Sequence, residues 1–379
     1  MFYLSLIKEK CYNELHVFLE IFVLLYADDT VIFADNYDEM QNALKVFENY
    51  CKMWKLSVNI GKTKVMVFSK RKSKMDFDFK LDGTSLEIVD SYTYLGLLLN
   101  YNGSFVCAKK KLVEQSQKAL FAVYTKIRNL HLPIDLQLKL FDYLVEPILL
   151  YGSEIWGFEN IDIIEKVHLQ FCKRILNVRS STPNVMVYGE LGRFPLEIKV
   201  KLRMLSFWSR MAKNENKLSS SMYKLIFKLH ADGICEFKWV SFVKSIFDNS
   251  GLGYMFFNQY IDYSTFKPVI KQILQDQFLQ KWSSNIDNSS RGEYYKLFKS
   301  QFGLENYLLR LPEDKRIWIS KLRTCNLKIP METGRWYNIA RTDRICTLCN
   351  ESCIGDEYHY LYVCNNSSIS ELRKKYIPK

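Results

Sequence analysis

The stretch Val23-Leu-Leu-Tyr-Ala-Asp-Asp-Thr-Val-Ile-Phe-Ala34 places two adjacent aspartates, Asp28 and Asp29, between two short apolar runs. Each run is rich in β-branched or aromatic residues, which is typical of a strand. The stretch therefore predicts two strands joined by a turn that carries both acids. Burying two like charges costs several kcal/mol each unless something compensates them, so a turn that aims both carboxylates at one point predicts a bound cation.

Carboxylate oxygens favour Mg²⁺ or Mn²⁺ over softer metals. Two such ions about 3.5–4 Å apart are the known arrangement for nucleotidyl transfer, in which one activates the attacking 3′-hydroxyl and the other stabilises the departing pyrophosphate. The alternative at this stage is a solvated Asp-Asp turn without a ligand, because such turns are common.

Composition and charge narrow the function classes. The chain has 379 residues, which at about 100–200 residues per domain suggests two or three domains. An apolar fraction of 48% and a charged fraction of 25% exclude a largely disordered chain, a collagen and a coiled-coil rod. Lys and Arg number 53 against 41 Asp and Glu, and the net charge of +12 favours anionic partners, nucleic acid before acidic membranes.

Targeting signals are not evident in the sequence. The first residues lack the order of a signal peptide, and the apolar run 17–27 is about half the ~20 residues that a membrane span needs. We therefore expect an intracellular protein of the nucleus or cytoplasm that is not secreted and has no membrane partner.

The first hundred residues predict strands with one helix against them. Apolar residues recur at spacings of three and four over Asp38–Leu56, which predicts an amphipathic helix. Val65–Phe68 is a predicted strand, and the alternation of Phe77, Phe79 and Leu81 with polar residues predicts a half-buried one. Asp82-Gly83 is a strong hairpin signal, and further strands are expected at 86–88 and 92–99.

Beyond Asn102-Gly103 the pattern becomes helical. The predicted helices cover a basic segment Lys109–Arg128, then Asp135–Leu150, Ile163–Leu176 and Leu196–Met211. Breaks are predicted at 180–183 and at Gly189–Gly192, and helical patterns over 214–330 are interrupted at Asp232-Gly233, Ser250-Gly251 and 285–292.

At this point the sequence resembles a known family. Leu24-Leu-Tyr-Ala-Asp-Asp-Thr-Val-Ile32 resembles the YxDD active-site hairpin of reverse transcriptases, which LINE-type (non-LTR) retrotransposons typically carry as YADD. Further segments follow in the family's order: Leu56–Lys64 for the palm, Tyr92-Thr-Tyr-Leu-Gly96 for the primer-grip hairpin, Leu149–Trp156 and Val187–Gly192 for the helical thumb, and Arg344–Cys364 for the C-terminal cysteine–histidine segment. The resemblance spans nearly the whole chain.

The resemblance implies an RNA-directed DNA polymerase, a nucleotidyltransferase that binds an RNA template, a DNA primer and their RNA–DNA hybrid. It implies that Asp28 is the main ligand of Mg²⁺ or Mn²⁺ and Asp29 the supporting one. The implied nucleic-acid- or nucleotide-binding residues are Tyr26, Lys62, Lys64, Tyr94, Gly96, Lys109, Lys110 and Lys111. The alternatives are that the two palm lysines solvate a strand end, that Tyr94 and Gly96 belong to a plain hairpin, and that the basic helix is a solvated face.

Other parts of the family's pattern are not matched. The family takes another metal-binding aspartate from an earlier palm strand, but no Asp precedes Asp28, and Glu9, Glu14 and Glu20 stand in no matching context. We therefore expect a C-terminal part of such a polymerase, starting just before the YADD motif and inactive without an upstream palm and fingers segment. The alternatives are a non-catalytic nucleic-acid-binding remnant of a retroelement, or a basic helical scaffold for protein partners.

Four of the ten cysteines lie near the C-terminal end of the sequence. Cys346-x2-Cys349-x9-His359-x4-Cys364 offers three thiolates and one imidazole, which are tetrahedral zinc ligands. Metal binding also provides folding free energy for a segment with little core of its own. Cys353 lies within the gap and competes as a ligand. The alternative is a set of reduced cysteines with His359 on the surface.

The expected fold class is α+β. We expect a truncated palm of antiparallel strands plus a helix at residues 1–100, a helical thumb at 101–215, a helical extension at 216–340, and a small zinc-knuckle-like segment at 341–379.

Overall fold

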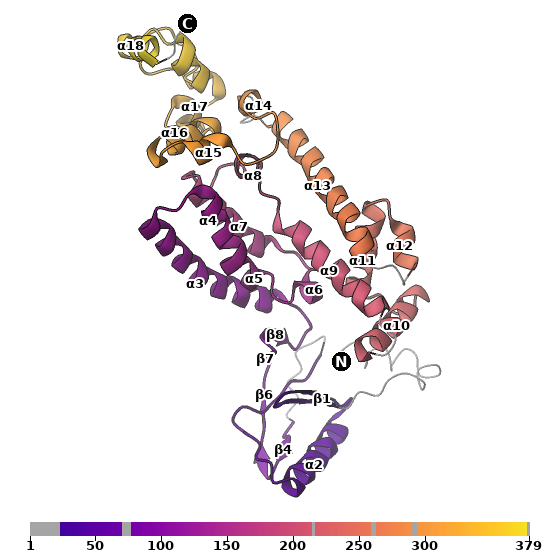
Figure 1. The fold of residues 1–379 in the computed structure, drawn as a ribbon. Coiled ribbons are helices and arrows are strands. Elements are labelled where there is room, and N and C mark those ends of the chain that lie inside the picture. Colours follow the sequence, from indigo (N-terminus) through magenta and orange to yellow (C-terminus); the bar gives the residue numbers. More distant parts are fainter. Residues whose placement is uncertain (1–22, 70–76, 214–216, 259–262, 290–293, 377–379) are drawn as a thin grey trace. The chain divides into compact units, whose positions relative to one another are not determined.

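The computed structural model describes residues 23–69, 77–213, 217–258, 263–289 and 294–376 (Figure 1). The chain divides into two compact units, each made of segments that are distant in sequence. Unit 1 comprises residues 1–119, 144–164 and 197–274, and unit 2 comprises residues 120–143, 165–196 and 275–379. The domain boundaries predicted near residues 100, 215 and 340 stay predictions.

The strands lie in the first part of unit 1 and pair two by two. They are β1 (Val23–Tyr26), β2 (Asp29–Ile32), β3 (Lys64–Val65), β4 (Lys80–Leu81), β5 (Thr84–Ser85), β6 (Glu87–Ile88), β7 (Ser91–Tyr94) and β8 (Leu97–Asn100). Three pairs are antiparallel, as expected, but β3 and β6 pair in parallel. The strand predicted over Val65–Phe68 is shorter than expected, since β3 covers only Lys64–Val65. The basic turn at 70–74 lies outside the described residues.

Helix α2 (Tyr37–Met53) matches the helix predicted over Asp38–Leu56 and ends three residues earlier. Its start is fixed by a reciprocal cap between Asn36 and Glu39. The Glu39 backbone N–H donates to the Asn36 side-chain oxygen at 2.9 Å, and the Asn36 side-chain NH2 donates to the Glu39 carboxylate at 2.8 Å. Leu44, on the buried face of the helix, packs against Phe79 and Leu81 in one apolar cluster. The burial predicted for Phe79 and Leu81 is thus confirmed, but the strand itself covers only Lys80–Leu81.

Two tight hairpins follow the sequence signals closely. Asp82 and Gly83 both have positive φ (49° and 71°), which is the two-residue turn whose twist suits a β-hairpin. Leu95 and Gly96 do the same between β7 and β8, with φ of 46° and 81°. A Cβ at Gly96 would lie 3.2 Å from a ring carbon of Tyr151, so this turn also sits tightly against its neighbour.

The remaining described residues are mostly helical, as predicted. From residue 106 to residue 287 the elements are α3 (Val106–Leu130), α4 (Ile134–Leu140), η2 (Phe141–Val145), α5 (Glu146–Leu149), α6 (Ser153–Trp156), α7 (Asp162–Ile175), α8 (Asn184–Leu191), α9 (Leu196–Lys213), α10 (Leu218–Ala231), α11 (Lys238–Asn249), α12 (Gly253–Phe257) and α13 (Tyr263–Asp287). The C-terminal elements are α14 (Tyr295–Phe298), α15 (Asn306–Arg310), α16 (Glu313–Arg323), α17 (Pro330–Trp336), η3 (Arg341–Asp343), η4 (His359–Val363) and α18 (Ser367–Tyr376). Among the helices of the described segments, none is long and apolar enough to cross a membrane.

The predicted break at Gly189–Gly192 is wrong in its first three residues. Helix α8 continues through Gly189, and only Gly192, at φ 60°, ends it. A Cβ at Gly189 would stand 2.4 Å from the Tyr295 hydroxyl and 2.9 Å from the Trp282 ring. The small residue is therefore needed by tertiary packing in unit 2 and not by a turn.

Beside Gly189, the buried carboxylate of Glu190 organises a network that the sequence did not suggest. Glu190 is 0% exposed and accepts from the Arg323 guanidinium at 2.9–3.1 Å and from the Tyr307 hydroxyl at 2.7 Å. Because a buried charge is tolerated only when it is paired and hydrogen-bonded, this network fixes α8 to α15 and α16.

Candidate functional site

The two acids that opened the sequence lie at a strand–strand bend. Strands β1 and β2 pair antiparallel with Tyr26 opposite Asp29, which leaves Ala27 and Asp28 as a two-residue turn. Ala27 has φ 53°, a left-handed conformation of the kind that hairpin turns require at their first position. The predicted strand–turn–strand is therefore confirmed, with Asp28 at the tip and Asp29 at the start of β2.

Both carboxylates are exposed to solvent. Within the described parts of the chain, neither one has a hydrogen bond or an ion pair, and no group of three or more metal-ligating side chains includes them. The earlier acids Glu9, Glu14 and Glu20 lie outside those parts. The hairpin thus offers oxygen ligands suited to a hard divalent cation, but fewer than a site for such a cation needs.

The hairpin is also poorly covered by the rest of the described protein. Leu25 is 73% exposed and Tyr26 is 62% exposed, and β1 and β2 pair only with each other among the described strands. An isolated two-stranded hairpin is marginally stable in water. Its exposed apolar side chains are therefore suited to packing against further protein or a bound ligand.

Lys62 and Lys64 differ in their surroundings. Lys64 donates to the Glu87 carboxylate across the parallel β3–β6 pair at 2.6 Å. Lys62 is exposed, and its backbone N–H donates to the Asn59 side chain at 3.1 Å. Of the two, Lys62 is the one whose charge is not already compensated by an acid in the described structure.

The hairpin of β7 and β8 is held from two directions. The Tyr151 hydroxyl donates to the Leu95 carbonyl at 2.6 Å, and Lys111 of α3 donates to the Thr93 hydroxyl at 2.7 Å. Tyr94 is half-buried next to Leu95 and Gly96 in the turn. The turn that the resemblance assigns to the primer end is therefore a fixed element.

The structure corrects the expectation for Lys109. This residue is 2% exposed, and its ammonium group donates to the Glu159 carboxylate at 2.7 Å and to the Asn160 carbonyl at 2.9 Å. It joins the first part of α3 to the segment before α7, and its charge is already compensated by an acid. The neighbouring Lys110 is exposed on the other side of the same helix.

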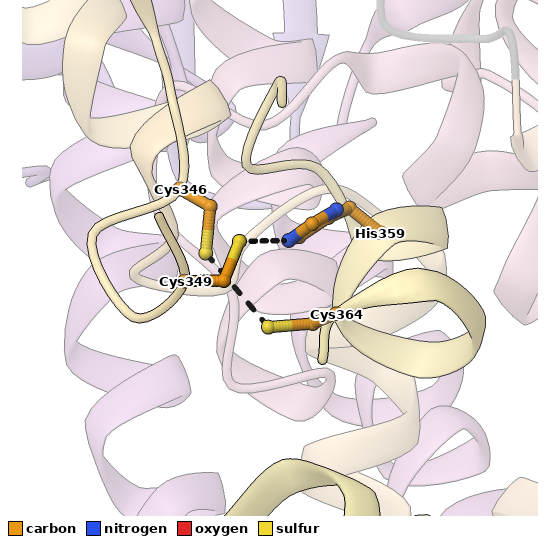
Figure 2. Close-up of side chains that lie close together, drawn as sticks. All are labelled: Cys346, Cys349, His359 and Cys364. Carbon is orange, nitrogen blue, oxygen red and sulfur yellow. Dashed lines mark hydrogen bonds between the residues drawn. The ribbon is translucent and has the colours of Figure 1, made fainter. Parts of the chain in front are cut away.

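A second candidate site lies near the C-terminus, in unit 2. The ligand atoms of Cys346, Cys349, His359 and Cys364 all lie within 4.8 Å of one another, and Figure 2 shows the four side chains converging. The Cys349 Sγ is 3.4 Å from the His359 Nε2, and the sulfurs of Cys346 and Cys364 are 4.0 Å apart. A zinc tetrahedron with bonds of about 2.0–2.3 Å has ligand–ligand separations of about 3.5–3.8 Å, so these residues fit the ion.

Two local backbone features bring the four ligands together. Ile345 and Ile354 form an isolated β-bridge, and the Cys346 N–H donates to the Cys353 carbonyl at 2.8 Å, which closes the loop carrying the first two cysteines. The element η4 is a π-helix, in which residues five apart lie one turn apart. His359 and Cys364 have that spacing, and the Cys364 N–H donates to the His359 carbonyl at 2.7 Å.

The competing cysteine is excluded from this group. Cys353 Sγ donates to the Glu351 carbonyl at 3.5 Å, and Cys353 is not one of the four convergent ligands. Cys353 contributes to the loop through its backbone carbonyl, which accepts a hydrogen bond from the Cys346 N–H.

Electrostatics at Cys346 favour the form that a metal requires. Burial raises the pKa of the Cys346 thiol, but hydrogen bonds from the Tyr360 side chain and from the Leu348 and Cys349 backbone outweigh burial and bring the pKa to about 6. Because the thiolate is the metal-binding form, this cysteine is prepared for coordination near neutral pH.

Sequence analysis did not predict which residues support these ligands. Asp356 accepts from the His359 backbone N–H at 2.8 Å and from the Tyr294 hydroxyl at 2.6 Å. Arg373 of α18 donates to the carbonyls of Leu361 and Cys364 at 2.9 and 2.8 Å. The only signal in the sequence was the closeness of Asp356 to His359, because the partners Tyr294 and Arg373 are set by the fold.

Comparisons with known proteins bear on the first site. Residues 3–99 match the family described as reverse transcriptase (RNA-dependent DNA polymerase). The RNA-directed DNA polymerase from mobile element jockey of Drosophila funebris is 22% identical over 170 residues, which cover 42% of this chain and 18% of that protein. The resemblance to LINE-type reverse transcriptases is confirmed by these two matches. The matched range contains Asp28, Asp29 and both hairpins described above.

A putative uncharacterized transposon-derived protein of Caenorhabditis elegans is 31% identical over 150 residues, covering 38% of this chain and 52% of that protein. The chain therefore spans about half the length of one curated relative and about a fifth of the other. No solved structure matches the chain.

Proposed function

We propose that this chain carries the catalytic hairpin of an RNA-directed DNA polymerase of a non-LTR retrotransposon. The observation that carries the proposal is the Tyr26-Ala-Asp-Asp29 turn, which presents two solvent-exposed carboxylates at the end of a strand pair inside the family match. The substrates are an RNA template, a DNA primer and deoxynucleoside triphosphates, and the net charge of +12 suits these polyanions.

Each part of the palm has a task in this reaction. Asp28 and Asp29 would hold Mg²⁺ or Mn²⁺, with Asp28 as the main ligand, and the bound ions would supply activation of the 3′-hydroxyl and charge neutralisation on the leaving pyrophosphate. Lys62, whose charge is uncompensated among the described residues, faces the triphosphate, and Tyr94 and Gly96 form the fixed turn against the primer end.

The catalytic site is completed by a carboxylate from another segment. Two exposed acids without a third ligand in the described structure bind a divalent ion weakly, since such sites need several oxygen ligands. The exposed side chains of Leu25 and Tyr26 are where a completing palm strand packs. The chain alone is therefore inactive or nearly so.

Primer extension on an RNA template with Mg²⁺ tests the proposal. The purified chain is assayed alone and after mixing with a separately produced palm-and-fingers segment of a related retroelement polymerase. We expect no extension by the chain alone and extension by the mixture. Asp28→Asn in the mixture abolishes it, while Asp38→Asn, a matched exposed acid in the first turn of α2, leaves it intact.

Two results contradict this proposal in different ways. Extension by the chain alone that Asp28→Asn removes would show that the site is complete without another segment. No extension by the mixture, together with salt-sensitive binding of an RNA–DNA hybrid, would favour a non-catalytic nucleic-acid-binding remnant. The exposed, unpartnered acids among the described residues are the observation that keeps this second function in view.

We also propose that Cys346, Cys349, His359 and Cys364 bind one structural zinc ion. All four positions of the tetrahedron are protein ligands, which is typical of a structural site and not of a catalytic one. The ion stabilises the segment from Arg344 to Tyr376, which has few buried apolar side chains besides its own cysteines.

A further inference from the structure

Three tyrosines form a series on the outside of the cysteine–histidine segment. The rings of Tyr294 and Tyr358 are nearly parallel, with centroids 6.5 Å apart and planes inclined by 7°. The rings of Tyr358 and Tyr362 follow at 5.4 Å with planes inclined by 42°. Tyr358 is 54% exposed and Tyr362 is 53% exposed, so both rings present a face or edge to solvent.

The geometry of the helical turn explains why these rings point outward. His359 and Cys364 lie on the buried side of η4, with exposures of 3% and 0%. Tyr358, the residue before η4, and Tyr362 are four residues apart, close to one turn of this helix, and both are exposed to solvent. The four-residue spacing therefore repeats an aromatic ring along the solvent face while the five-residue spacing repeats a metal ligand along the buried face.

The series is held in place by the same contacts that support the metal ligands. The Tyr294 hydroxyl donates to one carboxylate oxygen of Asp356, and the other oxygen accepts from the His359 backbone N–H. The first ring and the turn that carries the other two are thus joined through one side chain. Rings fixed in this way lose little conformational entropy when a ligand binds.

Positive charge lies on the helix that contacts the same turn. Helix α18 packs on η4 through Arg373, which donates to the carbonyls of Leu361 and Cys364. The following residues, Lys374 and Lys375, are exposed in the last turn of α18. The aromatic rings on η4 and the exposed lysines on the helix in contact with it offer both contacts that a single strand needs, since its bases stack and its phosphates are anionic.

We propose that Tyr294, Tyr358 and Tyr362 form a platform on which unpaired bases of single-stranded nucleic acid stack, with Lys374 and Lys375 contacting the phosphates. Because every base has a flat π face, such a platform binds with little sequence preference. Paired bases in a duplex are stacked on each other and do not reach it. This site lies in unit 2 and is independent of the polymerase reaction proposed for the hairpin in unit 1.

Fluorescence anisotropy with the full chain tests the platform. Labelled oligouridine and labelled oligothymidine of the same length are titrated, with a blunt DNA duplex of that length for comparison. The double variant Tyr358→Ala, Tyr362→Ala is expected to raise Kd for both single strands by about tenfold or more, because each base stack contributes substantially to binding. Phenylalanine at both positions keeps the rings and is expected to keep the affinity.

Matched controls separate stacking from other causes. Tyr254→Ala removes a ring that is 65% exposed in unit 1 and is expected to leave both Kd values unchanged. Metal content and the thermal midpoint, measured for each variant, verify that the segment remains folded. Lys374→Ala is expected to weaken single-strand binding and to lower its salt dependence.

Four outcomes overturn the platform. These are wild-type protein that does not bind either single strand, alanine variants that bind as wild type, phenylalanine variants that lose as much affinity as the alanine variants, and an equal loss for the duplex. The platform variants leave every residue assigned to the polymerase reaction in place, so failure of the platform does not bear on the polymerase proposal. Failure of the polymerase proposal likewise does not bear on the platform.

Discussion

The two candidate metal sites of this chain differ in completeness. The hairpin offers two exposed carboxylates with no partner in the described structure, whereas the cysteine–histidine cluster offers four convergent ligands, three of them buried. Asp356 and Arg373 further support the cluster by hydrogen bonds to its backbone. The four ligands of one site lie within one short segment, whereas the described residues bring no third ligand to the two carboxylates of the other.

The difference follows from where the ligands come from. All four soft ligands fall between residues 346 and 364, so a loop and a single π-helical turn bring them together. A carboxylate centre for nucleotidyl transfer takes its acids from strands that are distant in sequence, and a hairpin contributes only neighbours. Exposed carboxylates remain stable without further ligands because water solvates them, whereas buried thiolates need a compensating cation.

The largest expected effect is loss of metal from the complete site. Purified protein is expected to contain about one equivalent of zinc, and Cys349→Ser is expected to weaken zinc binding by more than about a hundredfold, since even outer-sphere changes cost 10–100-fold. Elemental analysis after dialysis against a chelator measures this. Cys353→Ser is the matched control, because its sulfur lies outside the group and only its carbonyl is used. Equal loss in both variants would mean that the ligand set is assigned wrongly.

An intermediate effect is expected where the loop of the cluster is tightly packed. A Cβ at Gly355 would lie 2.9 Å from Pro330 Cγ and 3.1 Å from the backbone Cα of Cys346. Gly355→Ala is therefore expected to cost about 1–3 kcal/mol of unfolding free energy, as overpacking does, and to lower zinc retention. Denaturant unfolding measures the change in unfolding free energy, and elemental analysis measures the zinc retained. At Gly303 an added Cβ meets no atom within 4 Å, so Gly303→Ala is the control and is expected to change little.

The smallest expected effect is on the stability of the incomplete site. Asp28→Ala removes an exposed side chain without a partner among the described residues, so the free energy of unfolding is expected to change by less than about 0.5 kcal/mol. Thermal unfolding with and without Mg²⁺ measures it. A marked loss of stability, or a marked stabilisation of the wild type by Mg²⁺ alone, would show that the hairpin already forms a complete ion site.

Local sequence patterns predicted much of the structure of the first hundred residues. The Asp-Asp turn between two apolar runs, the Asp82-Gly83 hairpin and the capped helix α2 depend on residues within a few positions of each other, and all three are in the structure. The four spaced ligands of the cysteine–histidine cluster converge as well. The parallel pairing of β3 with β6 was not foreseen, because the strands are two residues long and carry no periodicity to detect.

Charge and packing at single residues were decided by distant partners. Lys109 looked like its neighbour Lys110 in a basic run, but Glu159 and Asn160 bury it, and no local pattern shows where an acid fifty residues away will lie. Gly189 looked like a helix end, but the rings of Tyr295 and Trp282 require its missing Cβ.

The sequence by itself determined the hairpin that presents Asp28 and Asp29 and the spacing that makes Cys346, Cys349, His359 and Cys364 a possible ligand set. Turn geometry and ligand spacing are properties of a few consecutive residues, so they can be recognised before the chain is folded. Only the tertiary structure decided that Cys353 stays outside the cluster and that Glu190 is a buried structural charge. Those outcomes depend on which remote side chain reaches the residue and removes water from it.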